Sequence, residues 1–468
     1  MLNSNIVQQL RKEAEQKNQR HIFRFWDELS TQSREKLIDQ VQSIDFDLLL
    51  SLKKNYIDQL EERLFSKTLT PPDIIPIPKT DQQQKEAEKA KKIGEQLLTE
   101  GKVGAILVAG GQGTRLGFDG PKGKFKIGPV SRKTFFQLYS EQIKALNRKY
   151  KTTIPWFIMT SESNHQETVD YFKENSYFQL NPDDVYFFKQ GMIPALDAAG
   201  RVFLDAKDHI FTNPNGHGGT LKALRDNGCI DEMKRRNIEE LFYFQIDNVL
   251  IKICDPTFIG YHHREKAEMS LKVVSKRDPY EKLGVVGKLD GTLTIIEYSD
   301  LYNADKEARN PDGSLKYRGG SIAIHVFKRT FLEEQSKQAK LPYHLAHKKI
   351  EYIDETGKLI QPDKLNGYKF EMFIFDALPN AQRAVIMEVD RAEEFSPVKN
   401  MKGIDSVETA TIDLINYYRR MLLQAGVNIP PENTRLEISP NFALDVEELK
   451  QKIDPSKIRV DLPMYLED

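Results

Sequence analysis

A loop rich in glycine and cationic residues carries the clearest chemical signal in the sequence. It lies in "VGAILVAGGQGTRLGFDGPKGKF", residues 103–125, and follows directly on a run of small and β-branched residues. Its most informative residues are four glycines and three cations: Gly110, Gly111, Gly113, Gly117, Arg115, Lys122 and Lys124. Glycine lets backbone N–H groups approach phosphate oxygens closely, and Arg and Lys side chains neutralise phosphate charge. We therefore predict that this loop wraps a nucleoside triphosphate.

The loop departs from the two common phosphate-binding patterns. A dinucleotide fingerprint reads G-x-G-x-x-G, but counting from Gly111 the third glycine position is Leu116. No stretch supplies the G-x-x-x-x-G-K-[ST] pattern of a Walker A loop. A solvated surface loop with ordinary cations is the alternative, and the position directly after a buried strand disfavours it.

Other catalytic arrangements find little support. His344 and His347 are three residues apart on an expected helix, and His262 and His263 are adjacent, but nothing specifies a further zinc ligand. The sequence has no G-x-S-x-G motif for a serine hydrolase. We interpret the acidic stretch "RAEEFSPVKN" as a solvated edge rather than a carboxylate dyad.

Strands and helices alternate in the middle of the chain. The apolar stretches "VGAILVAG", "IPWFIMTS", "DVYFFKQ" and "ELFYFQIDN" predict buried strands, and therefore a mixed, mostly parallel sheet in an α/β fold. After the first strand, a helix is expected with Ser131 as its N-cap and one buried face. That face carries Phe135, Leu138, Tyr139 and Leu146. Hairpins are predicted to turn at Asp290-Gly291 and near Thr356-Gly357.

The flanking regions complete a three-part organisation. Residues 1–98 are predicted to form an N-terminal helical segment, residues 99–388 the α/β core, and residues 389–468 a small C-terminal domain. In the first part, one helix is expected from the amphipathic spacing of five residues, and a later helix is expected to end at Gly101. The five residues are Ile22, Phe23, Phe25, Trp26 and Leu29.

Composition narrows the class of protein. The chain has 468 residues, 39% hydrophobic and 29% charged, with a net charge of -1. That balance argues against nucleic acid as a partner, and no apolar run is long enough for a membrane span. Only two cysteines occur and the first residues lack a signal-peptide core, so we expect a cytoplasmic protein. Nothing in the sequence specifies an oligomeric state.

The loop is the first of an ordered series of motifs. "LVAGGQGTRLG" and "PKGKF" are followed by "FFKQGMIPAL", "NPNGHGGTLKAL", "QIDNVLIKICDP", "VVGKLDGTLTIIEYSDL", "GSIAIHVF", "NGYKFEMFIFDAL" and "EVDRAEEFSPVKN". This series, from about residue 95 to 415, resembles the eukaryotic-type UDP-sugar pyrophosphorylases, and most closely their N-acetylglucosamine branch. The resemblance implies a Rossmann-like nucleotidyltransferase core that joins UTP and a sugar 1-phosphate, with Mg²⁺, and releases pyrophosphate.

The resemblance also implies residues for the nucleotide and the metal. Gly110, Gly111 and Gly216 would lie against the nucleotide, and the Gln190 amide would read the uracil edge by donating and accepting together. Asp247, after a strand, would hold Mg²⁺. Taken alone, Gln190 reads as a solvated loop amide, and Asp247 as a cap of the following turn with Asn248.

The sugar phosphate and the catalytic cations follow from the same resemblance. Arg115, Lys122 and Lys399 would stabilise charge on the reacting phosphates, and Lys369 would bind the phosphate of the sugar. Gly284 and Glu297 match sugar-binding positions.

Two further sugar-facing positions depart from the family pattern. The N-acetylglucosamine branch carries asparagine at both, where this chain has His217 and Ser321. "PNGHGG" also resembles a stretch of glucose-1-phosphate uridylyltransferases. The block similarity favours N-acetylglucosamine 1-phosphate, with glucose 1-phosphate or a broad range of sugars as the alternative. A catalytically silent nucleotide-binding protein is the alternative of another class.

Overall fold

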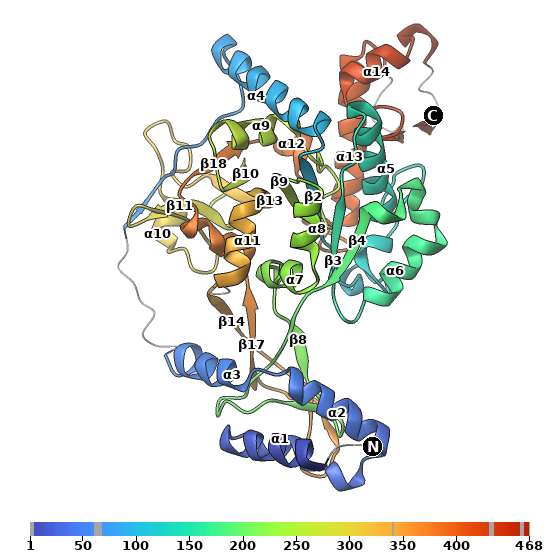
Figure 1. Cartoon of the computed structure of the whole chain (residues 1–468). Coiled ribbons are helices and arrows are strands. Elements are labelled where there is room, and N and C mark those ends of the chain that lie inside the picture. Colours follow the sequence, from blue (N-terminus) through green and yellow to red (C-terminus); the bar gives the residue numbers. More distant parts are fainter. Residues whose placement is uncertain (1–3, 60–67, 339–340, 430–434, 459–462, 468) are drawn as a thin grey trace. The chain divides into compact units, whose positions relative to one another are not determined.

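The computed structural model describes residues 4–59, 68–338, 341–429, 435–458 and 463–467. The chain divides into two compact units, each assembled from three segments (Figure 1). Unit 1 comprises Met1–Lys67, Gly191–Gly219 and Leu341–Ile374, and unit 2 comprises Thr68–Gln190, Thr220–Lys340 and Phe375–Asp468. The predicted three-part division follows the order of the chain, whereas these two units are defined by proximity in space. The three-part division therefore stays a prediction. Within the described residues, no helix combines the length and the apolar character that a membrane crossing requires.

A mixed sheet forms the centre of unit 2, as the sequence predicted. Four neighbouring strands are parallel, in the order β9-β2-β3-β4. Their bounds are Glu240–Gln245, Val103–Val108, Trp156–Thr160 and Val185–Lys189. β13 (Gly319–Lys328) then adds antiparallel to β9, with β10 (Met269–Ser275) and β11 (Val285–Leu289) pairing on it in turn. The parallel strands are the four apolar stretches named from the sequence.

Helices cover both faces of this sheet because its strands bury side chains on both sides. Ala105 and Leu107 of β2 lie in one apolar cluster with four helices, whereas Ile106 is buried on the opposite face. The four helices are α4 (Asp81–Thr99), α5 (Phe135–Tyr150), α9 (Pro256–Arg264) and α13 (Val407–Gln424). On the other face, the Thr220 hydroxyl of α7 (Thr220–Asp226) contacts Met159 Sδ of β3 at 3.3 Å.

Helices α4 and α9 cross in direct backbone contact (Figure 1). A Cβ at Gly94 would lie 1.9 Å from the carbonyl oxygen of Pro256, and one at Gly260 would lie 1.7 Å from that of Ala90. Only glycine fits at either crossing point, because any side chain would overlap the partner's backbone. α4 ends as predicted, since Gly101 adopts φ +67 directly beyond it.

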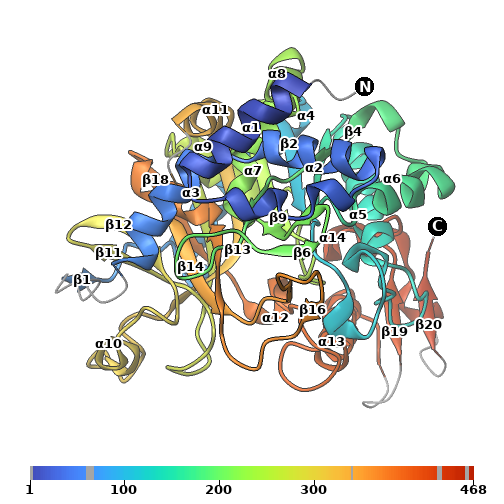
Figure 2. The ribbon, with the colours of Figure 1, turned by 90° about the horizontal axis from the view of Figure 1, so that it is seen from below.

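The start of α5 differs from the prediction. Its N-cap is Thr134, whose hydroxyl accepts from the Gln137 N–H while the Gln137 side chain accepts from the Thr134 N–H. Ser131, the predicted cap, instead donates its hydroxyl hydrogen to Glu437, a residue of β19 (Leu436–Ile438). The C-terminal elements α13, β19 and β20 (Met464–Leu466) lie in red beside one another in Figure 2. The predicted helical face of α5 is confirmed, because its four residues are all buried.

Unit 1 packs short helices against hairpins. α1 (Ser4–Gln16), α2 (Thr31–Ser43) and α3 (Phe46–Leu52) share an apolar cluster with residues of the hairpin strands. The predicted helix around Ile22 to Leu29 is wrong, since those residues lie in and around two 3₁₀ turns, Arg20–Phe23 and Trp26–Glu28. Ile22 and Trp26 are nevertheless buried.

Both hairpin turns predicted from the sequence are confirmed. Asp290 and Gly291 have φ +49 and +83 between β11 and β12 (Thr292–Ile296), and Gly357 has φ +82 between β15 (Tyr352–Ile353) and β16 (Leu359–Ile360). His344 and His347, by contrast, lie on a strand rather than a helix. That strand, β14 (Tyr343–Lys348), pairs antiparallel with β17 (Gly367–Met372).

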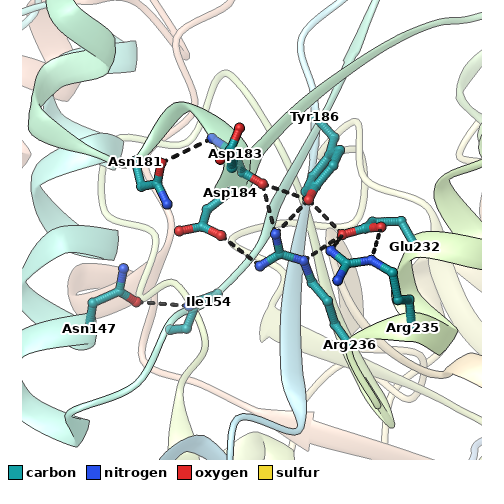
Figure 3. Close-up of polar contacts among 9 residues, drawn as sticks. All are labelled: Asn147, Ile154, Asn181, Asp183, Asp184, Tyr186, Glu232, Arg235 and Arg236. Atoms are coloured by element: carbon teal, nitrogen blue, oxygen red, sulfur yellow. Dashed lines mark hydrogen bonds and ion pairs between the residues drawn. The ribbon is translucent and has the colours of Figure 1, made fainter.

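A polar network secures the edge strand β4 to α8 (Cys229–Arg235). Figure 3 shows Arg236 between Asp184 and Glu232, with Nη1 to Asp184 Oδ1 and Nε to Glu232 Oε1 both 2.6 Å. The Tyr186 hydroxyl donates to Glu232 Oε1 at 2.7 Å. Hydrogen bonds from Arg235 are the largest cause that holds the pKa of Glu232 at about 2. This network fixes β4 at the amino end, away from the ends of the strands where the site residues lie.

The carboxylate of Glu240, at the start of β9, contacts both adjacent histidines of α9. Its Oε2 lies 3.1 Å from His262 Nε2, and its Oε1 lies 2.8 Å from His263 Nδ1. Within the described residues, no group of three or more His, Cys, Asp or Glu side chains is arranged to hold a metal ion. Both histidines instead contact the buried Glu240 carboxylate, His262 from the core and His263 from a partly exposed position. Burial alone would raise the pKa of Glu240, but the hydrogen bonds from both histidines lower it to about 2.

We predict that Glu240→Gln lowers the free energy of unfolding by on the order of 2 kcal/mol near pH 6. The carboxylate's contribution is present above about pH 4.5 and is lost as the pH falls toward 2, because its pKa is depressed in the folded state. The pKa of His263 is raised by Glu240, so its contribution is present below about pH 6.5 and is lost at higher pH.

Urea denaturation of the wild type and Glu240→Gln across pH 3–9 measures this difference. Glu239→Gln, which changes the neighbouring carboxylate paired with Lys102, is the matched control. A destabilisation that does not vary with pH would contradict the assignment.

Candidate functional site

The glycine loop begins at the end of β2 and is anchored by a buried asparagine. The Ala109 N–H donates to Met159 O at 2.8 Å, which prolongs the strand pairing by one residue. Asn164 Nδ2 then donates to Ala109 O at 3.0 Å and to Gly111 O at 3.4 Å. Asn164 is fully buried, and its role was not predicted because its partners are backbone atoms some fifty residues away.

The loop folds back on itself beyond this anchor. The Gly113 N–H donates to Gly120 O at 2.9 Å, and a Cβ at Gly113 would lie 2.7 Å from the ring of Phe118. Gly117 adopts φ +62, in the left-handed region that favours glycine. The shape of the loop itself requires glycine at Gly113 and Gly117. Gly110 and Gly111 are the two loop glycines that were predicted to lie against the nucleotide.

Gly110 and Gln190, both predicted to bind the nucleotide, lie against each other. A Cβ at Gly110 would lie 3.1 Å from Gln190 Oε1, so any side chain there would press on the amide. The Gln190 N–H donates to Thr160 O at 2.8 Å, and its side chain is buried rather than a solvated loop amide. The end of β4 thus presents an amide beside the glycine backbone at the end of β2.

Four of the predicted charged residues come together beside the loop. Lys122 Nζ lies 3.9 Å from Asp247 Oδ2, and the Lys122 N–H donates to Gly111 O at 3.1 Å. Burial lowers the pKa of Lys122, with Arg115 and Lys399 lowering it further while Asp247 opposes them. Two further cations and one carboxylate therefore act on Lys122, an arrangement that attracts anionic ligands.

The third cation of the loop has a different role. Lys124 Nζ lies 2.6 Å from Glu167 Oε1 of α6 (His165–Glu174) and 5.2 Å from the ring centre of Tyr171. This pairing neutralises the Lys124 side chain and directs it toward α6. The loop therefore contributes Arg115 and Lys122 to the charged group, and Arg115 is exposed.

The turn that carries Asp247 is braced from inside the core. The Tyr139 hydroxyl lies 3.2 Å from Ile246 O and donates to Asn248 O at 2.8 Å, and the Ile246 N–H donates to Val108 O at 3.1 Å. Asn248 Oδ1, rather than the Asp247 carboxylate, accepts from the Leu250 N–H in this turn, at 3.3 Å. Tyr139 was identified from the sequence as part of a buried helix face, but its support of the turn was not.

Lys399 reaches the charged group from a separate segment. Its Nζ lies 3.7 Å from Asp405 Oδ2, and its N–H donates to Asp405 O at 2.7 Å. The predicted solvated edge before it is wrong, because Glu394 is buried and pairs with Lys272. Lys399 is thus carried on a segment that is fastened to the core.

The residues present suit a magnesium ion held partly by substrate. Asp247 is a single carboxylate, and its oxygen is farther from Lys122 than a hydrogen bond. Mg²⁺ commonly takes one or two protein carboxylates and completes its shell with water and substrate phosphates, so a single Asp is sufficient.

The predicted sugar residues of unit 2 form a group of their own. The Ser321 N–H donates to Gly284 O at 2.8 Å, and a Cβ at Gly284 would lie 3.5 Å from Glu297 Oε1. Ser321 lies on β13 next to a bulge, where Ala323 takes φ +56 and the pairing with β10 shifts register. Bulges often redirect side chains at functional sites.

The remaining predicted residues belong to unit 1. Gly216 has φ +83, and a Cβ on it would lie 2.4 Å from Met372 O, so the chain itself requires glycine there. Lys369 of β17 lies with its Nζ 4.9 Å from the ring centre of Phe211, and burial lowers its pKa.

His217 is buried, and its backbone contact defines its tautomer. The Ile374 N–H donates to His217 Nδ1 at 3.1 Å, which places the ring hydrogen on Nε2. The ring stacks on Phe373, with 5.2 Å between ring centres. Burial, and then repulsion from His344, lowers the pKa of His217 to about 4. At neutral pH this side chain is therefore an uncharged hydrogen-bond donor through Nε2.

Known proteins are similar to this chain in sequence and in fold over most of their length. The profile of the UTP--glucose-1-phosphate uridylyltransferase family matches residues 50–453. UDP-N-acetylhexosamine pyrophosphorylase-like protein 1 of Homo sapiens is 35% identical over 439 residues, which cover 90% of this chain and 86% of the human protein. UDP-N-acetylglucosamine pyrophosphorylase of Saccharomyces cerevisiae is 35% identical over 458 residues, covering 92% and 94%. The structure of the uridine diphosphate N-acetylglucosamine pyrophosphorylase from Trypanosoma brucei superposes with a TM-score of 0.84 at 27% identity, covering 96% of this chain and 95% of that one.

These matches agree with the fold described above. The sheet and its loops have the nucleotidyltransferase-type α/β fold of solved UDP-sugar pyrophosphorylases. The chain belongs to the UTP--glucose-1-phosphate uridylyltransferase family.

We predict that His217 stays neutral at every pH above about 5, because its pKa is about 4. Its proton-coupled nitrogen signals in a ¹⁵N-histidine NMR titration should not move between pH 5.5 and 9, and the signals should report hydrogen on Nε2. His217→Gln assigns the resonances. A midpoint near pH 6.5 would show that the ring is solvated and would remove its assignment as a fixed donor.

Proposed function

We propose that the protein transfers the uridylyl group of UTP to a sugar 1-phosphate, forming a UDP-sugar and pyrophosphate. The single observation that carries this proposal is the group of Arg115, Lys122, Asp247 and Lys399 beside the glycine loop. Membership of the family and relatives named as pyrophosphorylases support the same reaction.

The chemistry follows from the charges of the reactants. A phosphate oxygen of the sugar 1-phosphate attacks the α-phosphorus of UTP, and the bond to the pyrophosphate leaving group breaks. Both reactants are anions, so the protein must chiefly position them in line and neutralise their charge. Arg115 and Lys122 are proposed to stabilise the leaving pyrophosphate, and Lys399 the incoming phosphate. Lys369, on its strand in unit 1, is proposed to bind the sugar phosphate as well.

Asp247 is proposed to hold Mg²⁺ together with the phosphates of the substrates. When bound, the ion would supply positive charge that offsets the negative charge of the phosphates. Lys122 then has two partners in turn: the Asp247 carboxylate before substrate binds, and phosphate oxygens afterwards. The separation of 3.9 Å suits such an exchange, because the pair makes no short hydrogen bond that must first be broken.

N-acetylglucosamine 1-phosphate is the proposed sugar substrate. The relatives named for N-acetylated sugars are about 35% identical to this chain over nine-tenths of its length. His217 differs from the asparagine of that branch but supplies a hydrogen-bond donor, Nε2–H, as an amide does. The carbonyl oxygen of an acetamido group is an acceptor that such a donor can bind, and Ser321 supplies a hydroxyl.

We also propose that the protein works in the cytoplasm on small molecules, with neither nucleic acid nor membrane as a partner. Cys229 and Cys254 are both buried and unpaired in a disulfide, which suits a reducing compartment. The balanced charge of the chain gives no basic field for a polyanion.

Pyrophosphate release from UTP and Mg²⁺ tests the function. Four sugar 1-phosphates are compared by kcat/KM: N-acetylglucosamine, N-acetylgalactosamine, glucose and galactose. We expect the acetamido sugars to be preferred. Preference for glucose would show that His217 and Ser321 mark a different sugar pocket, and no release with any of the four from folded protein would overturn the transfer reaction.

Lys122→Ala is predicted to lower kcat by on the order of 100-fold, since a donor aimed at developing charge has an effect of that size. Lys124→Ala is the matched control, because it removes a lysine of the same loop that pairs with Glu167 instead. Steady-state kinetics of both variants measure their kcat relative to the wild type, and only Lys122→Ala is expected to show the loss. Equal losses in the two would mean that the loop tolerates neither change for reasons of folding, and would remove Lys122 from the reaction.

A further inference from the structure

The side chain of Asn248 joins the turn that carries Asp247 to residues 394–399, the segment that carries Lys399. Nδ2 donates to Glu394 O at 2.7 Å, and Oδ1 accepts from the Ser396 N–H at 2.9 Å. The residue is 4% exposed, so these bonds form away from water. One amide therefore holds the segment by two backbone groups, a donor and an acceptor.

Backbone contacts continue this junction on both sides. The Val398 N–H donates to Asp247 O at 2.9 Å, one residue before Lys399. The Val249 N–H donates to Ser396 O at 3.3 Å, and Asn248 pairs with Pro397 as an isolated antiparallel bridge. The two segments thus run side by side, and their register fixes how far apart Asp247 and Lys399 lie.

The far side of the segment is fastened to the core. Glu394 pairs with the fully buried Lys272 of β10, whose Nζ also lies 2.7 Å from Asp255 Oδ2. The Ser396 hydroxyl donates to Asp413 Oδ2 of α13 at 2.7 Å. With Glu394 and Ser396 both held by the core, the Asn248 amide is the side-chain link between this support and the turn that carries Asp247.

We propose that Asn248 is a positioning residue of the transfer reaction, which sets the separation between Asp247 and Lys399. The inference rests on the proposed function, because it assigns those two residues to the metal and to the incoming phosphate. The Asn248 amide is buried on backbone groups of Glu394 and Ser396, so its proposed action is through the segment that carries Lys399. A displacement of about 1 Å between reacting groups can lower a rate by about 100-fold.

Asparagine is the residue that this junction requires. An amide donates and accepts at once, whereas Asp would accept only and would set a carboxylate beside Glu394 O. Alanine would leave the Ser396 N–H and Glu394 O buried without the partner that Asn248 gives them. Either change should let the segment shift relative to the turn.

The test begins with Asn248→Ala in the full-length protein, assayed with UTP, Mg²⁺ and N-acetylglucosamine 1-phosphate. We expect kcat to fall at least 10-fold with KM for UTP nearly unchanged, and with an unshifted pH profile because no titrating group is altered. Asn147→Ala is the matched control, since Asn147 Oδ1 accepts from the Ile154 N–H at 2.9 Å before β3 (Figure 3). It is expected to retain wild-type turnover.

A double-mutant cycle with Lys399→Ala separates positioning from general structure. If Asn248 acts through Lys399, then Asn248→Ala should cause little further loss in the Lys399→Ala background. Multiplying losses would overturn the inference. Hydrogen exchange gives a readout independent of activity: the Ser396 and Val398 amides should exchange faster in Asn248→Ala, and unchanged exchange at both would also overturn it.

Asn248→Asp keeps the inference testable if the alanine variant does not fold. It retains the acceptor for Ser396 and loses the donor to Glu394 O, so we expect the same loss of kcat and the same non-additivity with Lys399→Ala. Wild-type turnover in Asn248→Asp would overturn the inference. A wild-type protein inactive with all four sugar phosphates would instead overturn the proposed function, so the two failures are distinguishable.

Discussion

The parallel pairing of β2 with β9 is the constraint on which the candidate site of unit 2 depends. Val108 lies opposite Gln245, so both strands end at the same edge of the sheet. The glycine loop leaves from one strand and the Asp247 turn from the other, which brings Lys122 to 3.9 Å from Asp247. Ligands of open α/β sheets bind at the carboxyl ends of the strands, and this pairing alone puts the loop and the carboxylate there.

Charge at this edge explains why the site would favour a transition state with several anionic oxygens. Lys122 is partly buried among Arg115, Lys399 and Asp247, and burial lowers its pKa. Because the Lys122 ammonium group is incompletely solvated, phosphate oxygens can supply the hydrogen-bond acceptors that water does not. The glycine loop and the Asp247 turn are supported by neutral hydrogen bonds from Asn164, Tyr139 and Asn248 to backbone atoms. Neutral supports hold the loop and the turn without cancelling the charge that the substrates meet.

Local sequence signals predicted the elements and the neighbourhood of the site, but not its supports. All-apolar stretches gave the parallel strands, and Asp290-Gly291 gave a hairpin turn, because both depend on nearby residues. Ser131 was the predicted cap of α5, but Thr134 forms the capping box with Gln137, and the Ser131 hydroxyl bonds to Glu437, some three hundred residues away. His344 reads as helical by spacing but lies in a strand because β17 pairs with it. The supporting roles of Asn164, Tyr139 and Asn248 were not predicted, because their partners are backbone groups that become close only in the fold.

In the proposed reaction the sugar phosphate attacks UTP directly, with charge stabilisation in place of a protein nucleophile. The most direct measurement is the stereochemistry at the α-phosphorus, using UTP with a single sulfur-substituted configuration there and N-acetylglucosamine 1-phosphate as acceptor. One in-line displacement predicts inversion of configuration in the UDP-sugar product. Retention would require two displacements through a covalent protein intermediate, and would contradict the assignment of Arg115, Lys122 and Lys399 as the reacting machinery.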